Sequence, residues 1–432
     1  MSQETASHFV VPIILFDITF LMDLFCKTRK SSSLASGTRK RLVSAICKAC
    51  CSLASALQSA KDLVPETFRS ALACHLYMLY NIMTVHESES KASNTSKISK
   101  SAGEDMQSSR ETCAVAMNTV THVMAKFKSS LWKRGVADEN IVTLPCRIAY
   151  QMMENSTGVQ ARKLASGDLA IQMIASTLNS TDCLLNTVVS ALVDMLHSYE
   201  HMAPLVAEIC VLVNDEPKNK LAFELLKEIG SLDGSADSDT SGKASGIKNV
   251  APFLNCLAEK KPQFLLEHID FVLPHLQAEP YNLRSAILTS IGHILIQCNL
   301  AEKEKEEDRE GMEEQEIVEN ETKTKKLLKT KENLYKLLLE HVYDVSSYTR
   351  VAVLKTWATL IEAKVLPVDK LAPITKIVID RLQDKTVMVR RIAMQVSFTF
   401  QYIVSILLDT LIEFVSIFCF LQSIDSDYGL GK

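Results

Sequence analysis

Glycine and proline are scarce in this sequence, with 13 Gly and 11 Pro among 432 residues, where an average protein has about 7% Gly and 5% Pro. Many short strands joined by tight turns need more of both residues. A G-x-S-x-G motif and a dinucleotide fingerprint are also missing. The sequence therefore predicts a mostly helical chain without an assembled catalytic site, and we expect no cofactor and no small-molecule substrate.

The sequence also lacks a strong charge of one sign. Its formal net charge is −4 and its pI is near 6.2, so no global basic field attracts nucleic acid. Any contact with chromatin or DNA is expected to be indirect or weak. The 12 cysteines are scattered, mostly among aliphatic residues, which suits buried thiols in a reducing compartment.

Two long apolar runs raise the question of a membrane. The N-terminal run contains Pro12, Asp17 and Asp23 and no basic residues before it, which favours a core segment over a signal peptide. The run over 398–424 is long enough to cross a bilayer, but Asp409 and Glu413 lie near its middle, where a charge costs about 2.5 kcal/mol or more. A membrane contact is disfavoured, and a membrane-tethered scaffold stays as an alternative.

Polar segments divide the chain. Ser-rich stretches and a charged stretch offer few large apolar side chains, so they are expected to form linkers or exposed insertions. The predicted organisation is an N-terminal helical region (1–86), a Ser-rich linker (87–112), a second helical region (113–230), a flexible loop (231–248), a region of helical repeats (249–396) with a charged insertion (302–332), and a divergent apolar tail (397–432).

An internal repeat is visible in the last third of the chain. Placing Arg284, Arg350 and Arg390 in one column brings apolar positions into register in all three copies. Arg350 and Arg390 are about 40 residues apart, which is the period of HEAT repeats. The interval from Arg284 to Arg350 is longer than this period by about the length of the charged insertion. The pattern predicts an all-α, HEAT-type helical-hairpin solenoid.

An acidic residue stands six positions before two of these arginines, as Asp344 before Arg350 and Asp384 before Arg390. Catalysis needs one such pair, whereas a repeated pair suits contacts between neighbouring units. We therefore interpret Arg284, Asp344, Arg350, Asp384 and Arg390 as a structural repeat ladder and assign no residue to catalysis.

A zinc-peptidase spacing, H-x-x-E-H, occurs at His197, Glu200 and His201. On one helix the two histidines would share a face. A catalytic zinc also needs a third protein ligand, and no downstream motif supplies one. His197 and His201 are therefore weak metal candidates in the last turn of a helix, and a zinc hydrolase is the least favoured alternative.

Two basic clusters near the N-terminus have the composition of a two-part nuclear import signal. The alternative is a solvated loop. The clusters consist of Lys27, Arg29 and Lys30, followed by Arg39, Lys40 and Arg41.

Residues 113–393 resemble a known family in order, including turn and loop positions. The segments that carry the resemblance include "LLNTVVSALVDMLHSYEHMAPLVAEI", "KLAFELLKEIG" and "LLLEHVYDVSSYTRVAVLKTWATLIEAKVLPVDKL". They are similar to condensin complex subunit 1, the family of D-type HEAT subunits of condensin. Family members are much longer, and the similarity fades after Ile392. The resemblance identifies the chain as an N-terminal fragment of such a subunit.

The resemblance implies a scaffold in the complex that compacts mitotic chromosomes. It implies the kleisin and SMC ATPase subunits as partners, with ATP hydrolysis in those ATPases. It also implies a location in the nucleus and on chromosomes, with a cytoplasmic pool, and places the H-x-x-E-H segment within an ordinary helix. Another HEAT adaptor, of the transport or phosphatase type, is the alternative scaffold.

Overall fold

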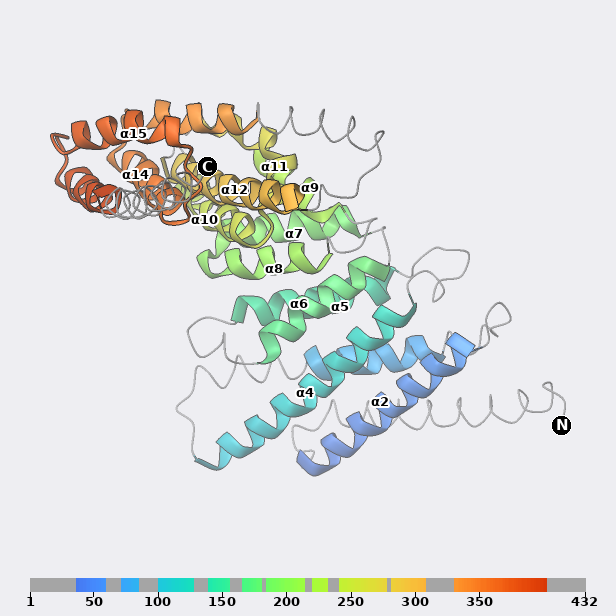
Figure 1. Ribbon diagram of the computed structural model, residues 1–432. Helices are drawn as coiled ribbons and strands as arrows, with labels where there is room; N and C mark the ends of the chain where they lie inside the picture. Colours follow the sequence, from blue (N-terminus) through green and yellow to red (C-terminus); the bar gives the residue numbers. More distant parts are fainter. Residues whose placement is uncertain are drawn as a thin grey trace, which may run out of the picture. The chain divides into compact units, whose positions relative to one another are not determined.

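The computed structural model describes residues 36–59, 71–84, 100–127, 139–155, 165–180, 184–213, 220–231, 241–277, 281–307 and 330–401. Every regular element in these ranges is helical, and none is a strand. The chain divides into two compact units, Met1–Glu228 and Ile229–Lys432, which Figure 1 colours from blue through green and from yellow to red. Each unit is described separately.

The first unit is a stack of helices in which second neighbours in the sequence pack together. Helix α2 packs on α4, α4 on α6 and α6 on α8, while α5 packs on α6 and α7 on α8. This alternation is typical of repeated helical hairpins. The helices are α2 (Ser36–Ser59), 71–84, α4 (Lys100–Phe127), α5 (Glu139–Asn155), α6 (Ala165–Ser180), α7 (Leu185–Ser198), α8 (Ala203–Val213) and α9 (Leu221–Gly230), which reaches the unit boundary.

The second unit, taken by itself, is also built of packed helices and contains the repeat seen in the sequence. Helix α12 packs on both α10 and α14. The elements are α10 (Ser241–Lys260), α11 (Pro262–Glu267), the short 3-10 turns η4 (Ile269–Phe271) and η5 (Leu273–Gln277), α12 (Tyr281–Glu307), 330–341, α14 (Ser347–Glu362), α15 (Val368–Arg381) and 387–401. The predicted all-α, HEAT-type helical-hairpin solenoid is confirmed.

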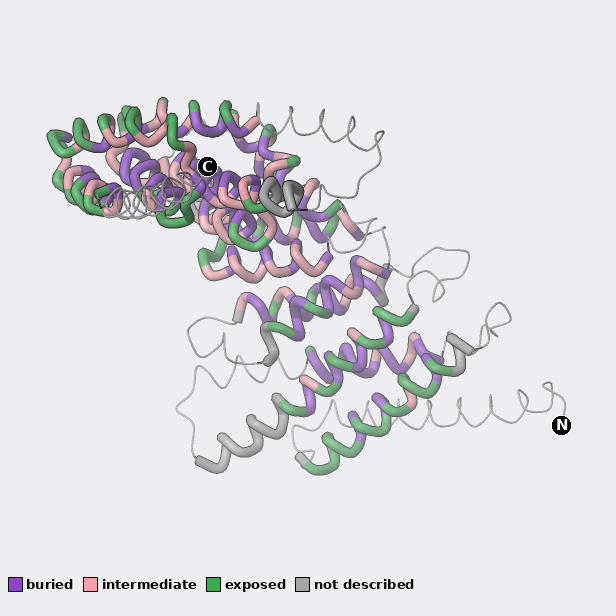
Figure 2. Tube along the Cα trace, in the orientation of Figure 1, coloured by how far each residue is buried: buried purple, intermediate pink, exposed green. Residues whose placement is uncertain are grey.

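The repeat columns are also the core of the second unit. Val272, Leu338 and Val378 occupy one column and are all buried. Trp357 on α14 is fully buried in the column of Ile291 on α12. In Figure 2 the buried residues lie where neighbouring helices face each other, and the outer sides of the helices are exposed. The helical spacing of apolar residues therefore sets which side of each helix packs.

Three predicted interruptions are shorter than the sequence suggested. Helix α4 begins at Lys100, inside the Ser-rich linker predicted over 87–112. Helix α10 begins at Ser241, inside the loop predicted over 231–248. Helix α12 extends to Glu307, inside the charged insertion predicted over 302–332. The polar residues at the ends of these helices lack the apolar periodicity from which helix boundaries are read.

One sharp helix end closes α14. Lys364 has φ 56, the left-handed region that glycine favours. The Val365 N–H donates to the Leu360 carbonyl at 3.1 Å, and the Lys364 N–H donates to the Ile361 carbonyl at 2.9 Å. These two bonds make a Schellman motif, in which the position of Lys364 is usually glycine.

We predict that Lys364→Gly stabilises the second unit. A residue with a Cβ in the left-handed region is strained by roughly 1–2 kcal/mol, and glycine removes this strain. The larger conformational entropy of glycine in the unfolded chain offsets part of the gain. The free energy of unfolding should rise by about 1 kcal/mol, measured by hydrogen exchange of α14 amides in urea. Lys364→Ala keeps the Cβ and should give no gain; an equal gain from both variants would contradict the prediction.

Candidate functional site

The ladder residues meet across repeat boundaries, where the turn between the two helices of one copy lies beside the next copy. Arg284 begins the second helix of its copy, and its Nη2 donates to Asp344 Oδ1 at 3.2 Å. Its Nε lies 3.2 Å from Asp344 Oδ2. The two side chains are 60 positions apart in the sequence. The structure thus brings an arginine of one copy to the acid of the following copy.

The next pair repeats this contact with a better geometry. Arg350 Nε and Nη2 donate to the two carboxylate oxygens of Asp384, each at 2.9 Å. The side chains are only 5% and 3% exposed. A two-pronged contact of this kind matches the planar guanidinium to the carboxylate and is among the stronger charge-assisted interactions. Burial makes the loss of either partner costly, because the remaining charge is left unpaired.

Arg350 and Arg390 each also hold the turn of their own copy. Arg350 Nη1 donates to the carbonyl oxygens of Asp344 and Val345 at 2.7 and 3.1 Å. Arg390 Nη1 makes the equivalent contacts to Asp384 and Lys385, again at 2.7 and 3.1 Å. One guanidinium therefore satisfies carbonyl groups that the turn leaves unpaired, which stabilises the turn's shape.

Asp344 and Asp384 also accept hydrogen bonds from the backbone of their own turns. Asp344 Oδ1 accepts a hydrogen bond from the Ser346 N–H at 2.7 Å, and Asp384 Oδ1 accepts one from the Thr386 N–H at 2.9 Å. These side-chain turns set the direction in which the following helix starts. Each acid is thus bonded both to its own turn and to the arginine of the preceding copy.

Arg390 is the last arginine of the ladder. Its Nη1 contacts are those of Arg350, but no carboxylate partner for it occurs within residues 36–401 as far as the structure describes them. The five ladder residues therefore form two complete pairs, Arg284 with Asp344 and Arg350 with Asp384, and one half pair at Arg390.

The acid of the second pair is electrostatically distinct. Burial alone raises the pKa of the Asp384 carboxyl, but hydrogen bonds from Arg350 and from the Thr386 N–H outweigh burial and hold the pKa below its usual value. Arg381 adds a second guanidinium, whose Nη1 lies 3.4 Å from Asp384 Oδ2. Asp384 is therefore ionised at neutral pH and bound to its partners as an anion.

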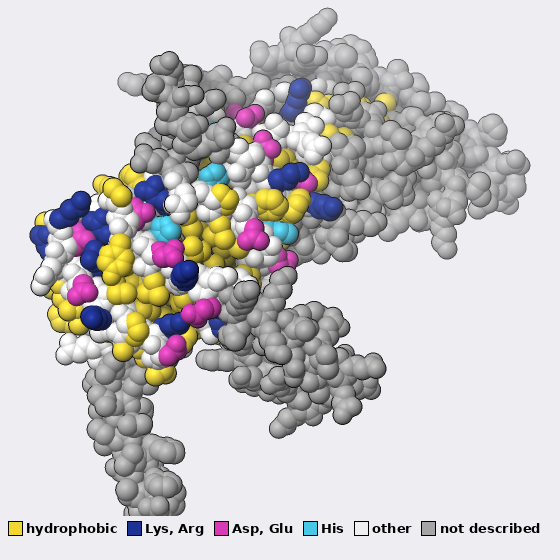
Figure 3. Space-filling model, turned by 90° about the horizontal axis from the view of Figure 1, so that it is seen from above, with side chains coloured by type: hydrophobic (Ala, Val, Ile, Leu, Met, Phe, Trp, Pro, Cys, Tyr) yellow, Lys and Arg dark blue, Asp and Glu magenta, His cyan; other side chains and the backbone are white. Residues whose placement is uncertain are grey.

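Aromatic and aliphatic side chains surround these turns on the outside. We call Tyr343, Val345, Tyr348 and Val387 the turn surface, because all four are more than half exposed. Tyr348 stacks on Tyr281 with ring centroids 4.7 Å apart. Figure 3 shows apolar side chains gathered between side chains of both charges on the face seen from above. Sequence reasoning missed this surface, although the tyrosines flank the turn that it identified.

The H-x-x-E-H segment does not lie on one helix. Helix α7 ends at Ser198, Tyr199 is extended with φ −137 and ψ 117, and a short 3-10 turn, Glu200–Met202, follows. The expectation that His197 and His201 share a helical face is therefore wrong. His201 Nε2 lies 3.2 Å from the Met153 carbonyl oxygen, and burial lowers the pKa of His197 although Asp194 opposes this effect.

Metal-binding groups do not gather elsewhere in the described ranges, where no three His, Cys, Asp or Glu side chains are placed to hold an ion. Cys47 and Cys50 on α2 are buried and free. Burial raises the pKa of both thiols, which disfavours the thiolate that a metal ion binds. Within the same ranges, none of the helices has the length and apolar character to cross a bilayer.

The two basic clusters have different outcomes. Lys27, Arg29 and Lys30 lie outside the described residues. Arg39, Lys40 and Arg41 lie in the first turns of α2, where Lys40 Nζ is 3.5 Å from Glu111 Oε2 on α4. The alternative of a solvated loop is therefore wrong for the second cluster, which is helical. Its role as an import signal stays a prediction.

Comparison with known proteins shows what this chain is similar to. Residues 34–182, about a third of the chain, match the family model of the non-SMC mitotic condensation complex subunit 1, N-term. Condensin complex subunit 1 of Xenopus laevis is 24% identical over 342 residues, which are 77% of this chain and 23% of that protein. The Mus musculus protein is 26% identical over 271 residues, 62% and 18% respectively. The resemblance to condensin complex subunit 1 is confirmed.

The chain spans about a quarter or less of the length of these condensin subunits. Among solved structures, a chain from the structure of the Pds5-Scc1 complex is similar over 84% of this chain and 54% of its own length. That similarity has 12% sequence identity and a TM-score of 0.37.

Breaking the second ladder pair should destabilise the second unit strongly. We predict that Asp384→Ala lowers the free energy of unfolding by about 3 kcal/mol or more, because it leaves Arg350 buried without a counter-charge. The double variant Arg350→Met with Asp384→Leu should lose less than the sum of the two single changes. Glu340→Ala, in the exposed pair with Lys336, is the control and should change stability by less than about 0.5 kcal/mol. Additive losses would contradict the coupling.

The lowered pKa of Asp384 predicts a pH dependence. Its folded pKa lies below its unfolded value, so its contribution is fully present above about pH 4 and is lost as the pH falls through the folded value. Asp384→Asn should therefore flatten the decrease in unfolding free energy from about pH 5 downward, measured in urea at several pH values. Asp380→Asn, a change at an exposed acid on α15, should retain the wild-type slope; identical slopes for wild type and Asp384→Asn would refute the assignment.

Proposed function

We propose that the chain is a non-enzymatic HEAT-repeat scaffold of condensin that binds the kleisin subunit and supports mitotic chromosome condensation. The observation that carries this proposal is the match of residues 34–182 to the condensin subunit 1 family. The matched relatives are named as subunits of the condensin complex. On this proposal ATP hydrolysis belongs to the SMC ATPase subunits, and the chain acts by binding.

The ladder supports a scaffold role because it fixes the spacing of helices. A surface composed from several repeats binds a partner well only if the repeats keep their relative positions. Arg350 holds the turn of its own copy and the acid of the next at once. The two complete ladder pairs therefore give the second unit a defined surface.

The turn surface is the part of this unit with the side chains that interfaces favour. Tyrosine is enriched in protein interfaces and supplies large contact areas at little entropic cost. Tyr348 is already ordered by its stacking on Tyr281, and Arg381 lies over the ring of Tyr343 at 4.9 Å. We therefore assign the kleisin contact of this unit to the turn surface.

Location follows from the same proposal. A condensin scaffold works on chromosomes, in the nucleus, with a cytoplasmic pool before assembly. The near-neutral net charge favours contact with DNA through partners over direct binding. The basic residues of α2 are candidates for the import signal that such a location requires.

We predict a one-to-one complex when the full chain is co-expressed with the kleisin subunit from the same source. Size-exclusion chromatography with light scattering measures the stoichiometry. Tyr348→Ser should weaken the complex by tenfold or more, as expected for an aromatic residue at an interface centre, where truncation costs about 2 kcal/mol.

The control is Val368→Ser, which changes an exposed aliphatic residue at the start of α15 that is not part of the turn surface. It should leave the affinity within about twofold. A folded monomer with no complex would refute kleisin binding and favour another type of HEAT adaptor. A complex unaffected by Tyr348→Ser but weakened by Val368→Ser would refute the assignment of the contact to the turn surface and leave kleisin binding itself in place.

A further inference from the structure

Arg381 gives the turn surface a cationic edge. Its guanidinium carbon lies 4.9 Å from the centre of the Tyr343 ring, which belongs to the preceding copy. A guanidinium over an aromatic face is held in place while its hydrogen-bond donors stay available. The Arg381 side chain is 20% exposed, so part of it is open to solvent. Arg381 therefore joins an exposed ring of the turn surface to a fixed positive charge.

The donors of Arg381 are used far less than those of Arg350. Arg350 Nε and Nη2 each donate to an oxygen of Asp384 at 2.9 Å. Arg381 reaches the same carboxylate only through Nη1, at 3.4 Å. Its Nε is buried and has no hydrogen-bond partner in the described part of the chain. Asp384 is thus engaged mainly by Arg350, and the exposed edge of Arg381 can take another anion.

The turn that follows Arg381 has an excess of positive charge. Residues 381–391, "RLQDKTVMVRR", carry four basic side chains and one acid, Asp384. The buried Arg350 compensates the charge of that acid. Lys385 directly follows Asp384 and is exposed. The charge around Arg381 and Lys385 therefore favours an acidic ligand.

The rest of the turn surface suits apolar side chains better than a nucleic acid. Val345 is 91% exposed and Val387 is 68% exposed, whereas phosphate oxygens are bound by basic and polar groups. Base stacking uses open ring faces. Tyr348 already stacks on another tyrosine, and Arg381 covers one face of the Tyr343 ring. The adjoining cationic and apolar positions fit a peptide with an acidic residue beside apolar ones.

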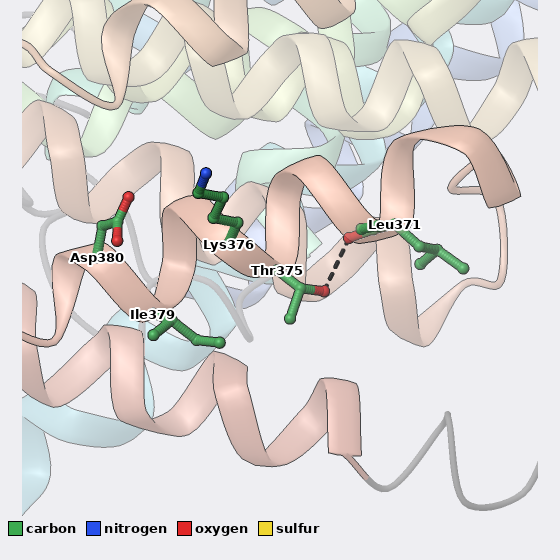
Figure 4. Close-up of a pocket in the computed structure, with 6 residues that line it drawn as sticks. Leu371, Thr375, Lys376, Ile379 and Asp380 are labelled. Carbon is green, nitrogen blue, oxygen red and sulfur yellow. Dashed lines mark hydrogen bonds between the residues drawn. The ribbon is translucent and has the colours of Figure 1, made fainter.

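An open groove on α15 is the competing surface of this unit. It has a volume of about 490 Å³ and is lined by Leu371, Ala372, Thr375, Lys376, Ile379 and Asp380. In Figure 4, Lys376 and Asp380 point to the same side of α15, and the Thr375 hydroxyl donates to the Leu371 carbonyl at 2.8 Å. Opposite charges four positions apart on a helix compensate each other. The groove lining thus has no net charge and no aromatic side chain, and Lys376 supplies a matched control.

We propose that Arg381 and Lys385 bind an acidic side chain of the kleisin, while apolar residues beside that acid pack on the turn surface. This inference rests on the proposed kleisin binding and adds the chemistry by which the partner is recognised. Tyr343 holds Arg381 in position, which reduces the entropic cost of ordering the cation on binding. The acid supplies specificity, and the tyrosines supply contact area.

The test measures the affinity of the full chain for the kleisin subunit from the same source at several salt concentrations. Arg381→Gln should weaken binding by about tenfold at low salt, as expected for a lost charge-assisted hydrogen bond. Its affinity should also fall less steeply with added salt than the wild-type affinity, because an attraction that salt screens is missing. Lys376→Gln removes one charge from the same helix, five positions away, and should retain both the wild-type affinity and its salt dependence.

Two further variants separate recognition from folding, because Arg381 also touches the ladder. Arg381→Lys keeps the charge and should retain the wild-type salt dependence. Lys385→Gln changes an exposed side chain and should weaken binding by about threefold at low salt. The free energy of unfolding of each variant is measured alongside, and Lys385→Gln alone decides the outcome if Arg381→Gln does not fold.

Kleisin variants identify the acid. Replacing the acidic residues of the kleisin by their amides, one block at a time, should find one block whose loss does not add to that of Arg381→Gln. Additive losses for every block, or wild-type affinity in both Arg381→Gln and Lys385→Gln, would overturn the acidic contact and leave kleisin binding in place. The absence of a complex at every salt concentration would instead refute kleisin binding, and this inference with it.

A labelled oligothymidine tests the rival ligand class. Arg381→Gln should leave the affinity of the chain for this single strand unchanged. A loss of oligothymidine affinity in Arg381→Gln, with the kleisin affinity unchanged, would assign the cationic edge to nucleic acid and overturn the proposal.

Discussion

The contact between Arg350 and Asp384 is the constraint on which the second unit depends. It is buried, two-pronged and bonded at both ends to the backbone of a turn. Hydrophobic packing favours any arrangement that buries apolar area, since it has no direction. The buried ion pair has a direction and a fixed geometry, so it selects the one register in which consecutive hairpins align. The apolar columns then supply most of the stabilisation within that register.

Much of this could be read from the sequence. The register of Arg284, Arg350 and Arg390 and the apolar columns around them followed from a period of about 40 residues, and the structure brings the acids of two copies to those arginines. The pairing scheme was not readable: spacing shows that Asp384 and Arg390 belong to one turn, whereas Asp384 bonds through its side chain to Arg350 of the preceding copy. Such contacts between copies depend on how hairpins stack, which local pattern does not describe.

The failures have two physical causes. The break at Tyr199 separates His197 from His201 although the segment reads as one helix, because a single extended residue is set by the packing of α7 and α8 more than by local propensity. The helical starts at Lys100 and Ser241 were missed for the opposite reason. The polar residues there form the first turns of helices that are stabilised by packing further along the chain. A polar sequence carries little information about where such a helix begins.

The rungs of the ladder all run the same way. Arg284 reaches forward to Asp344, and Arg350 reaches forward to Asp384. The array therefore has a polarity: one end of each copy presents a carboxylate, and the other presents a guanidinium. Two identical ends brought face to face would place like charges together, so the pattern disfavours symmetric, end-to-end pairing through the rungs. A head-to-tail order is the arrangement that the ladder permits, and it is the order that a single chain provides.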